Sequence, residues 1–172
     1  MDKQRIEFFR LALLQTEDAL RGFDFGRAPL WAHEACAMFL LMYCHDLAQG
    51  LDKVGRRIDF HDHCRDGKDI TDEISGFRNG LCHIRSFHKE FHAPYSGPGN
   101  RLPFAVSTGG DGSVQIAGKE MLCPYKDDIL LQLGDLRLLV VRQISRFVQE
   151  SRVIVIELSE QHNVTWPKLD RM

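Results

Sequence analysis

Hydrophobic residues recur every three or four positions in the first part of the chain, and this spacing predicts an amphipathic helix over residues 3–21. Ile6, Phe9, Leu13 and Leu20 follow the spacing, with acidic and basic residues between them. The stretch from Gly22 onward is predicted to be a turn that leads into the next helix.

A second helix is expected from Pro29 to about Val54, because proline is well suited to the first turn of a helix. The segment is apolar nearly all round through Cys44. Such a pattern is typical of a helix at the centre of a bundle. The following stretch, Gly55 to Lys68, is rich in His, Asp and Arg and is predicted to be a loop.

A third helix is predicted from about Ile70 to at least Arg85. Asp69, with Asp72 three residues later, resembles a helix start. Pro and Gly residues between 94 and 99 then end the pattern.

The region after the third helix shows a β-hairpin signal. Phe104–Thr108 and Ser113–Ala117 are rich in strand-forming residues and flank a glycine-rich turn. We expect this hairpin as an insertion at about residues 102–120. Pro124 is then expected to open a long final helix that runs through Phe147.

The apolar spacing that predicts this final helix is carried by Ile129, Leu133, Leu136 and Val140. Residues 153–158 are β-branched enough to be either the end of the helix or a strand. The expected fold class is therefore all-α, a four-to-five-helix up-and-down bundle with a small β-hairpin before the last long helix. We expect one domain over residues 1–160 and a C-terminal tail over 161–172.

Composition narrows the possible partners. The 172 residues are 44% hydrophobic and 27% charged with a net charge of -2, so no overall field attracts nucleic acid and any contact needs a local basic patch. The apolar run from Ala35 to Cys44 is too short to span a bilayer, and no signal peptide is expected at the charged N-terminus. The odd number of cysteines, five, favours a reducing cytoplasm over a disulfide framework.

The stretch Arg78-Asn79-Gly80-Leu81-Cys82-His83 carries the most specific chemistry in the sequence. At about 100° per residue, the apolar residues of the third helix form one stripe, and Asn79 and His83 point away from it. Arg78 lies on the flank. The core stripe consists of Ile74, Phe77, Leu81 and Ile84.

Two interpretations of this stretch are open. It can be an ordinary solvated helix face, or a site where Arg78, Asn79 and His83 act together. Gly80 favours the second interpretation, because glycine within a helix costs about 1 kcal/mol relative to alanine and makes sense where another surface approaches closely.

Arg, then Asn, then His five positions after the Arg, on the third helix of a helical domain, resembles the HEPN superfamily (higher eukaryotes and prokaryotes nucleotide-binding). The resemblance implies a metal-independent endoribonuclease that needs no cofactor and has Arg78, Asn79 and His83 as catalytic residues. It also implies RNA as partner, a homodimer with the active site at the two-fold interface, and a toxin or phage-defence role with a possible antitoxin.

The alternative is a non-catalytic HEPN-like module that binds nucleotide or RNA and pairs with a nucleotidyltransferase partner. The expected hairpin insertion departs from the family pattern.

The residue types fit metal-free RNA cleavage, in which the ribose 2′-OH attacks the adjacent phosphate. Histidine titrates near neutral pH, so His83 can move the proton. Arg78 offers a fork that matches phosphate oxygens, and Asn79 can bind phosphate or orient the histidine. Arg85 and Lys89 are weaker candidates for contacts to the RNA backbone.

Two other groups of residues are candidates for functional roles. Glu34, His45 and Asp46 on the second helix are possible supports for the site, or polar residues at the bundle ends. The group His61, His63 and Cys64 invites a zinc interpretation, with His88 and His92 as further ligands, but a polar loop is favoured and no metal is expected.

Overall fold

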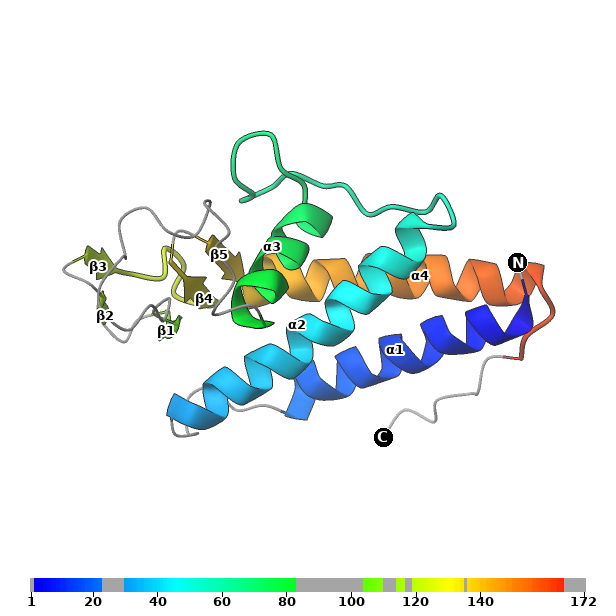
Figure 1. Cartoon of the computed structure of the whole chain (residues 1–172), viewed down its shortest axis with the longest axis horizontal. Coiled ribbons are helices and arrows are strands. Elements are labelled where there is room, and N and C mark those ends of the chain that lie inside the picture. Colours follow the sequence, from blue (N-terminus) through cyan, green and yellow to red (C-terminus); the bar gives the residue numbers. More distant parts are fainter. Residues whose placement is uncertain are drawn as a thin grey trace.

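Four α-helices and two small antiparallel sheets make up the described part of the chain in this computed structural model (Figure 1). The structure describes residues 2–22, 30–82, 104–109, 114–116, 119–134 and 136–165. The helices are α1 (Lys3–Gly22), α2 (Leu30–Asp52), α3 (Ile70–Cys82) and α4 (Arg146–Gln161). The strands are β1 (Phe104–Thr108), β2 (Val114–Ile116), β3 (Lys119–Met121), β4 (Ile129–Leu133) and β5 (Leu136–Leu139), and a π-helical segment, η2 (Val140–Ser145), leads into α4.

Helix α1 packs against both α2 and α4 and runs antiparallel to each (Figure 1). Gly50 of α2 allows close packing, since a Cβ at this position would lie 2.4 Å from the ring of Phe9. Glu17 of α1 accepts two hydrogen bonds from Arg152 of α4, at 2.7 and 2.6 Å. The predicted spans of the first two helices are confirmed.

Helix α3 begins where the sequence predicted. The backbone N–H of Asp72 donates to Asp69 Oδ1 at 2.8 Å, which satisfies one of the free amides of the first turn. Ile74, Phe77 and Leu81 are buried, so the predicted apolar stripe is confirmed for these positions. Ile84 and the expected continuation to Arg85 lie outside the described residues.

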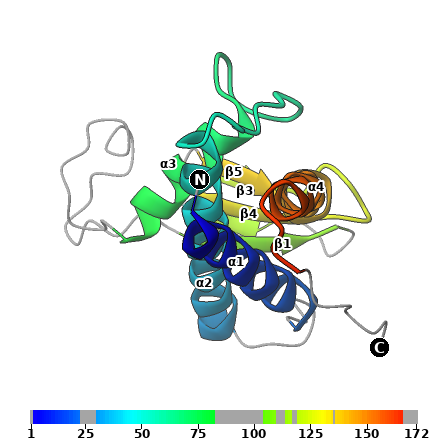
Figure 2. The ribbon, with the colours of Figure 1, turned by 90° about the vertical axis from the view of Figure 1, so that its right-hand side faces the viewer.

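The predicted all-α fold class does not account for the sheet that the structure contains. Strands β1, β4 and β5 form a three-stranded antiparallel sheet in the order β1-β4-β5. Figure 2 shows α3 and α4 on either side of the strands. The molecule is mostly helical, as expected, but α3 packs on a sheet as well as on α2.

The predicted final helix from Pro124 was wrong over residues 129–139, which form β4 and β5. The three-to-four spacing is present there, but these segments are also short, nearly continuous apolar runs. Gly134 between them has a φ of 60°, a conformation that glycine adopts readily and that tight hairpin turns require. The turn and the apolar runs together favour a buried hairpin over a helix.

The predicted hairpin pairing was also wrong, although its two strands exist. Phe104–Thr108 pairs with β4, and Val114–Ile116 pairs with β3. The buried leucines of β4 offer β1 a larger apolar face than the short β2 does. Gly109 ends β1 where only glycine fits, because a Cβ there would lie 2.0 Å from the carbonyl oxygen of Tyr125.

The start of η2 is held by Asp128, whose carboxylate accepts hydrogen bonds from the backbone N–H groups of Val141 and Arg142. Residues 153–158, left open between helix and strand, are helical in α4. One continuous core joins α1, α2, α3, the sheet and α4. Among the helices that the structure describes, none has both the length and the apolar character needed to cross a bilayer.

Candidate functional site

Two residues of the candidate motif, Arg78 and Asn79, lie on the last turns of α3, where this helix packs against α2. Both side chains are half-buried. Arg78 Nη1 donates to Asn79 Oδ1 at 3.1 Å. Asn79 therefore restrains the guanidinium of Arg78.

The Nε of Arg78 is buried and has no hydrogen-bond partner. Among the described residues, no carboxylate lies within ion-pair distance of this guanidinium. Buried polar atoms in folded proteins are nearly always paired, so an unpaired one calls for an explanation. A bound anion would supply the missing acceptor and the missing negative charge.

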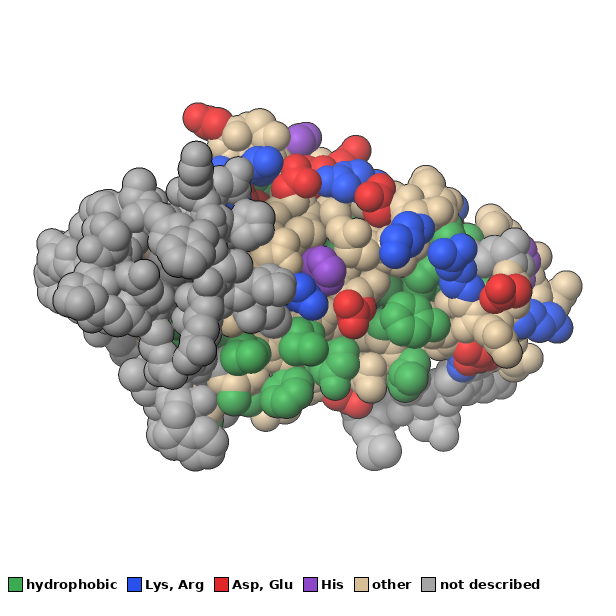
Figure 3. All heavy atoms as spheres, in the orientation of Figure 1, with side chains coloured by type: hydrophobic (Ala, Val, Ile, Leu, Met, Phe, Trp, Pro, Cys, Tyr) green, Lys and Arg blue, Asp and Glu red, His purple; other side chains and the backbone are tan. Residues whose placement is uncertain are grey.

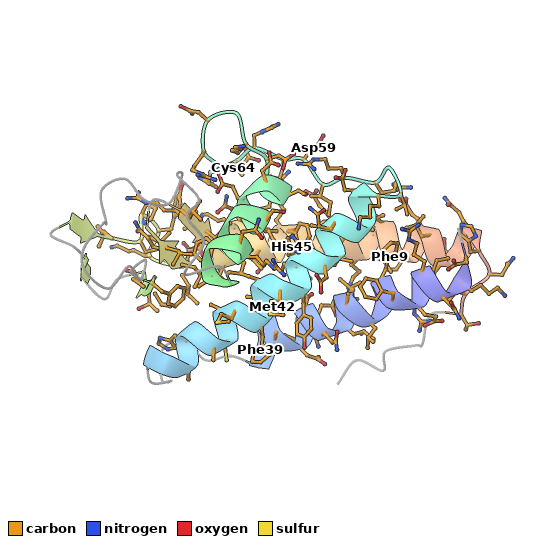
Figure 4. The ribbon with its side chains drawn as sticks, viewed as in Figure 1. Phe9, Phe39, Met42, His45, Asp59 and Cys64 are labelled. Atoms are coloured by element: carbon orange, nitrogen blue, oxygen red, sulfur yellow. The ribbon has the colours of Figure 1, made fainter. Side chains whose placement is uncertain are left out.

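Among the described residues, His45 of α2 is a histidine whose pKa is influenced by the charge of Arg78. Its side chain is 18% exposed, and Figure 4 shows it on α2 where α3 passes. Its Nδ1 is buried without a hydrogen-bond partner; the closest carboxylate oxygen, Oδ1 of Asp46, lies 3.5 Å away.

Burial lowers the pKa of His45 below its usual value of 6.5, and the positive charges of Arg78 and Lys53 lower it further. Asp46 acts in the opposite direction and does not reverse the shift. His45 is therefore a neutral imidazole at neutral pH. A neutral imidazole beside a guanidinium can accept a proton next to a bound anion.

This side of α3 is more covered than an ordinary solvated face. Gly80, expected on the outward side with Asn79, is buried. The burial agrees with the expectation that a small residue here permits the close approach of another surface.

The other predicted site residues are only partly placed. Asp46 is 54% exposed beside His45. Glu34 lies on α2, but its side chain is not among those described, and His83, Arg85 and Lys89 lie outside the described residues. The structure thus pairs Arg78 with Asn79 on α3 and His45 with Asp46 on α2, and these two helices pack against each other.

An open groove of about 430 Å³ lies between α1 and α2 and has His45 at its edge. Arg5 and Phe8 of α1 line one side, and Gln49 and Lys53 of α2 line the other. Arg5 and Lys53 are exposed, and Phe8 is 50% exposed. The groove therefore carries two cations and an accessible aromatic ring.

Helices α1 and α2 also carry exposed apolar side chains. Two of them, Phe39 and Met42, are three residues apart on α2; we call them the apolar patch, and they are 57% and 37% exposed. Figure 3 shows hydrophobic side chains gathered over these two helices, and Figure 4 shows Phe39, Met42 and His45 in succession along α2.

The loop group considered for zinc does not converge. His61 Nδ1 donates to the carbonyl oxygen of Lys68 at 2.8 Å, while His63 Nδ1 lies 3.3 Å from the hydroxyl of Tyr125. Burial raises the pKa of the Cys64 thiol to about 11, which disfavours the thiolate that zinc needs. Within the described ranges, no three His, Cys, Asp or Glu side chains are placed to hold a metal ion; His88 and His92 lie outside these ranges.

Comparison of the chain with protein-family models, with curated proteins and with solved structures finds no match.

Sequence reasoning missed the groove. One half of its signal was present, because His45, Gln49 and Lys53 are spaced four residues apart and share one face of α2. The α1 side of the groove had no such signal in the sequence, because Arg5 and Phe8 reach the groove only through the packing of α1 on α2.

Proposed function

We propose that this protein is a metal-independent endoribonuclease. The observation that carries the proposal is the guanidinium of Arg78, which is restrained by Asn79 and has a buried and unpaired Nε. Its charge acts on the imidazole of His45 on α2, which packs against α3. This is an arrangement suited to holding a phosphodiester while a proton is moved next to it.

In the proposed reaction the ribose 2′-OH attacks the adjacent phosphorus. A base takes the hydroxyl proton, the P–O5′ bond breaks, and the leaving 5′ oxygen receives a proton. The products are a 2′,3′-cyclic phosphate and a 5′-hydroxyl, and no redox partner or metal takes part. Arg78 offsets the charge that builds on the phosphoryl oxygens, and Asn79 holds Arg78 in place.

The reaction needs one group that accepts a proton and one that donates it. His83 is one of them in this proposal, as the HEPN resemblance implies. His45 supports the site as a second imidazole, because it is neutral at neutral pH and ready to accept a proton.

A homodimer with the site near its two-fold axis is part of the proposal. The apolar patch supports it, because Phe39 and Met42, on the same helix as His45, expose apolar surface that a second subunit would cover. A toxin or phage-defence role, with an antitoxin as possible partner, follows from the HEPN resemblance alone, and the reducing cytoplasm follows from the odd number of cysteines.

The test is cleavage of labelled RNA by the purified protein in excess EDTA, with Arg78→Ala and His83→Ala beside the wild type. We expect cleavage by the wild type with 2′,3′-cyclic phosphate ends, and loss of cleavage in both variants. Cleavage that survives both substitutions would refute the assignment. Intact RNA in every lane, with bound RNA detected, would instead favour the non-catalytic binding module with a nucleotidyltransferase partner.

A further inference from the structure

We infer that the groove between α1 and α2 binds single-stranded RNA and delivers it to Arg78, with Arg5 and Lys53 contacting phosphates and Phe8 stacking on a base. This inference rests on the proposed function, and it names the class of RNA that the site takes. Single-stranded nucleic acids are bound by grooves that combine basic side chains with accessible aromatic rings.

The two cations of the groove are available for phosphates. Both are exposed, and within the described part of the chain neither side chain is paired with a carboxylate. They lie on different helices, so a strand in the groove is contacted from both sides. The protein as a whole has a net charge of -2, so a local basic groove is what RNA binding requires here.

The aromatic ring of Phe8 is half-exposed although its neighbour Phe9 is buried in the core. The two rings meet edge to face, with their centroids 6.1 Å apart. Phe9 thus supports Phe8, whose other side faces the groove. A base stacked on such a ring contributes about 1–3 kcal/mol.

The groove and the candidate site share His45, which lines the groove and whose pKa is influenced by Arg78. Lys53 and Arg78 both act electrostatically on His45, one from the groove and one from α3. A strand bound along the groove therefore passes the imidazole of His45, on which the guanidinium of Arg78 acts. Asp46, at the same edge, repels phosphate and restricts the path to the side of His45.

Stacking on Phe8 requires an unpaired base, so duplex RNA does not fit this mode. Phosphate contacts and stacking do not read the 2′-OH, whereas the proposed cleavage needs it. Single-stranded DNA of the same sequence is therefore expected to bind in the groove without being cut.

The experiment measures binding of a fluorescein-labelled 12-nucleotide single-stranded RNA in excess EDTA, in the His83→Ala background so that the probe stays intact. Phe8→Leu should weaken binding about tenfold or more, and Phe8→Trp should restore it. Arg5→Ala with Lys53→Ala should reduce the slope of log affinity against log salt by about 1.4, as expected for two lost contacts to a single strand. Lys126→Ala, at an exposed lysine away from the groove, is the matched control.

Unchanged affinity in the groove variants would overturn the inference, as would a blunt RNA duplex that binds as tightly as the single strand. If RNA binding depends on the groove residues but the wild type does not cleave RNA, the groove inference stands and the proposed endoribonuclease activity is refuted. Cleavage by the wild type with an unchanged KM in the groove variants would retain the enzyme and refute the groove. Thermal melting of each variant confirms that these exposed substitutions leave the fold intact.

Discussion

The two halves of α3 differ in how their polar side chains are paired. In the N-terminal half the polar side chains are paired. Asp69 accepts two hydrogen bonds from Arg57, at 2.8 and 3.0 Å, and the fully buried carboxylate of Glu73 accepts from both the backbone N–H and Nε of Arg65. These contacts fix the loop after α2 onto the start of the helix.

In the C-terminal half the polar atoms lack such partners. Arg78 Nε is buried without a hydrogen-bond partner, and among the described residues the guanidinium donates only to the neighbouring amide of Asn79. On α2, which packs against α3, His45 Nδ1 is also buried, and the carboxylate oxygen of Asp46 lies 3.5 Å from it. In a network that contributes to stability the polar atoms are hydrogen-bonded to one another, whereas a ligand-binding site leaves donors or acceptors unpaired until the ligand binds. The difference separates the structural charges of α3 from its candidate functional charges.

The largest expected effect comes from comparing Arg78, in the C-terminal half of α3, with Arg57, a loop residue that binds the start of this helix. Arg78→Ala should lower kcat for RNA cleavage about 10²–10³-fold, the usual cost of removing one group that stabilises transition-state charge. Its free energy of unfolding should change little, because Arg78 has no paired carboxylate among the described residues. Single-turnover cleavage and urea unfolding measure the two quantities.

Arg57→Ala is the matched variant, and it should show the opposite result. Asp69 is 10% exposed and would lose its guanidinium, so the free energy of unfolding should fall by about 2 kcal/mol. The kcat of the folded protein should stay within about twofold of wild type, since Arg57 lies at the far end of α3. The comparison fails if Arg57→Ala loses activity while remaining folded, or if Arg78→Ala loses as much stability as Arg57→Ala.

The next effect concerns the apolar patch on α2. Phe39→Glu places a charge in the apolar patch and should dissociate the proposed homodimer, lowering activity in proportion to the dimer lost. Val153→Glu, on the exposed face of α4, is the control, because Val153 is 57% exposed like Phe39 and lies outside the patch. Sedimentation equilibrium measures the mass of each protein. A monomeric wild type, or a dimer that tolerates Phe39→Glu, would leave the patch without this role.

The sequence predicted α3 better than it predicted the C-terminal third. Ile74, Phe77 and Leu81 form the expected core stripe because burial on one face of a helix imposes its period on the sequence. Ile129–Leu133 and Leu136–Leu139 satisfy the same period but fold as strands, because the turn at Gly134 and pairing with β1 override it. Local spacing cannot reveal a competing long-range partner.

The candidate site shows the same limit. Arg78 and Asn79 were predicted from one short stretch, whereas His45 was only one of several polar residues on the second helix. Its position beside Arg78 depends on where α2 crosses α3, and that crossing is set by core packing between residues distant in sequence. The groove cations depend on the packing of α1 on α2 in the same way.

The smallest expected effect, the pH dependence of stability, also separates the two halves of α3. The pKa of His45 is lowered in the folded protein, so the unfolded chain binds more protons as the pH falls below 6.5. The lowered pKa of His45 therefore has no effect on the free energy of unfolding above this pH, and it decreases that free energy as the pH falls toward the folded pKa. His45→Gln should remove this decrease and flatten the curve of unfolding free energy against pH just below 6.5.

Asp69, in the other half, acts at lower pH. Burial alone would raise its pKa, but the hydrogen bonds from Arg57 and from the Asp72 backbone N–H outweigh burial and lower the pKa below 3.8. Its contribution to stability is present above 3.8 and is lost as the pH falls through the folded pKa. Arg57→Ala should weaken this second decrease and leave the first unchanged, whereas His45→Gln should do the reverse. Urea unfolding of both variants between pH 3 and pH 8 gives the free energy of unfolding as a function of pH. Two decreases that each disappear in only one variant are expected if the two halves of α3 are electrostatically independent. If either substitution changes both decreases, the two halves form one electrostatic unit.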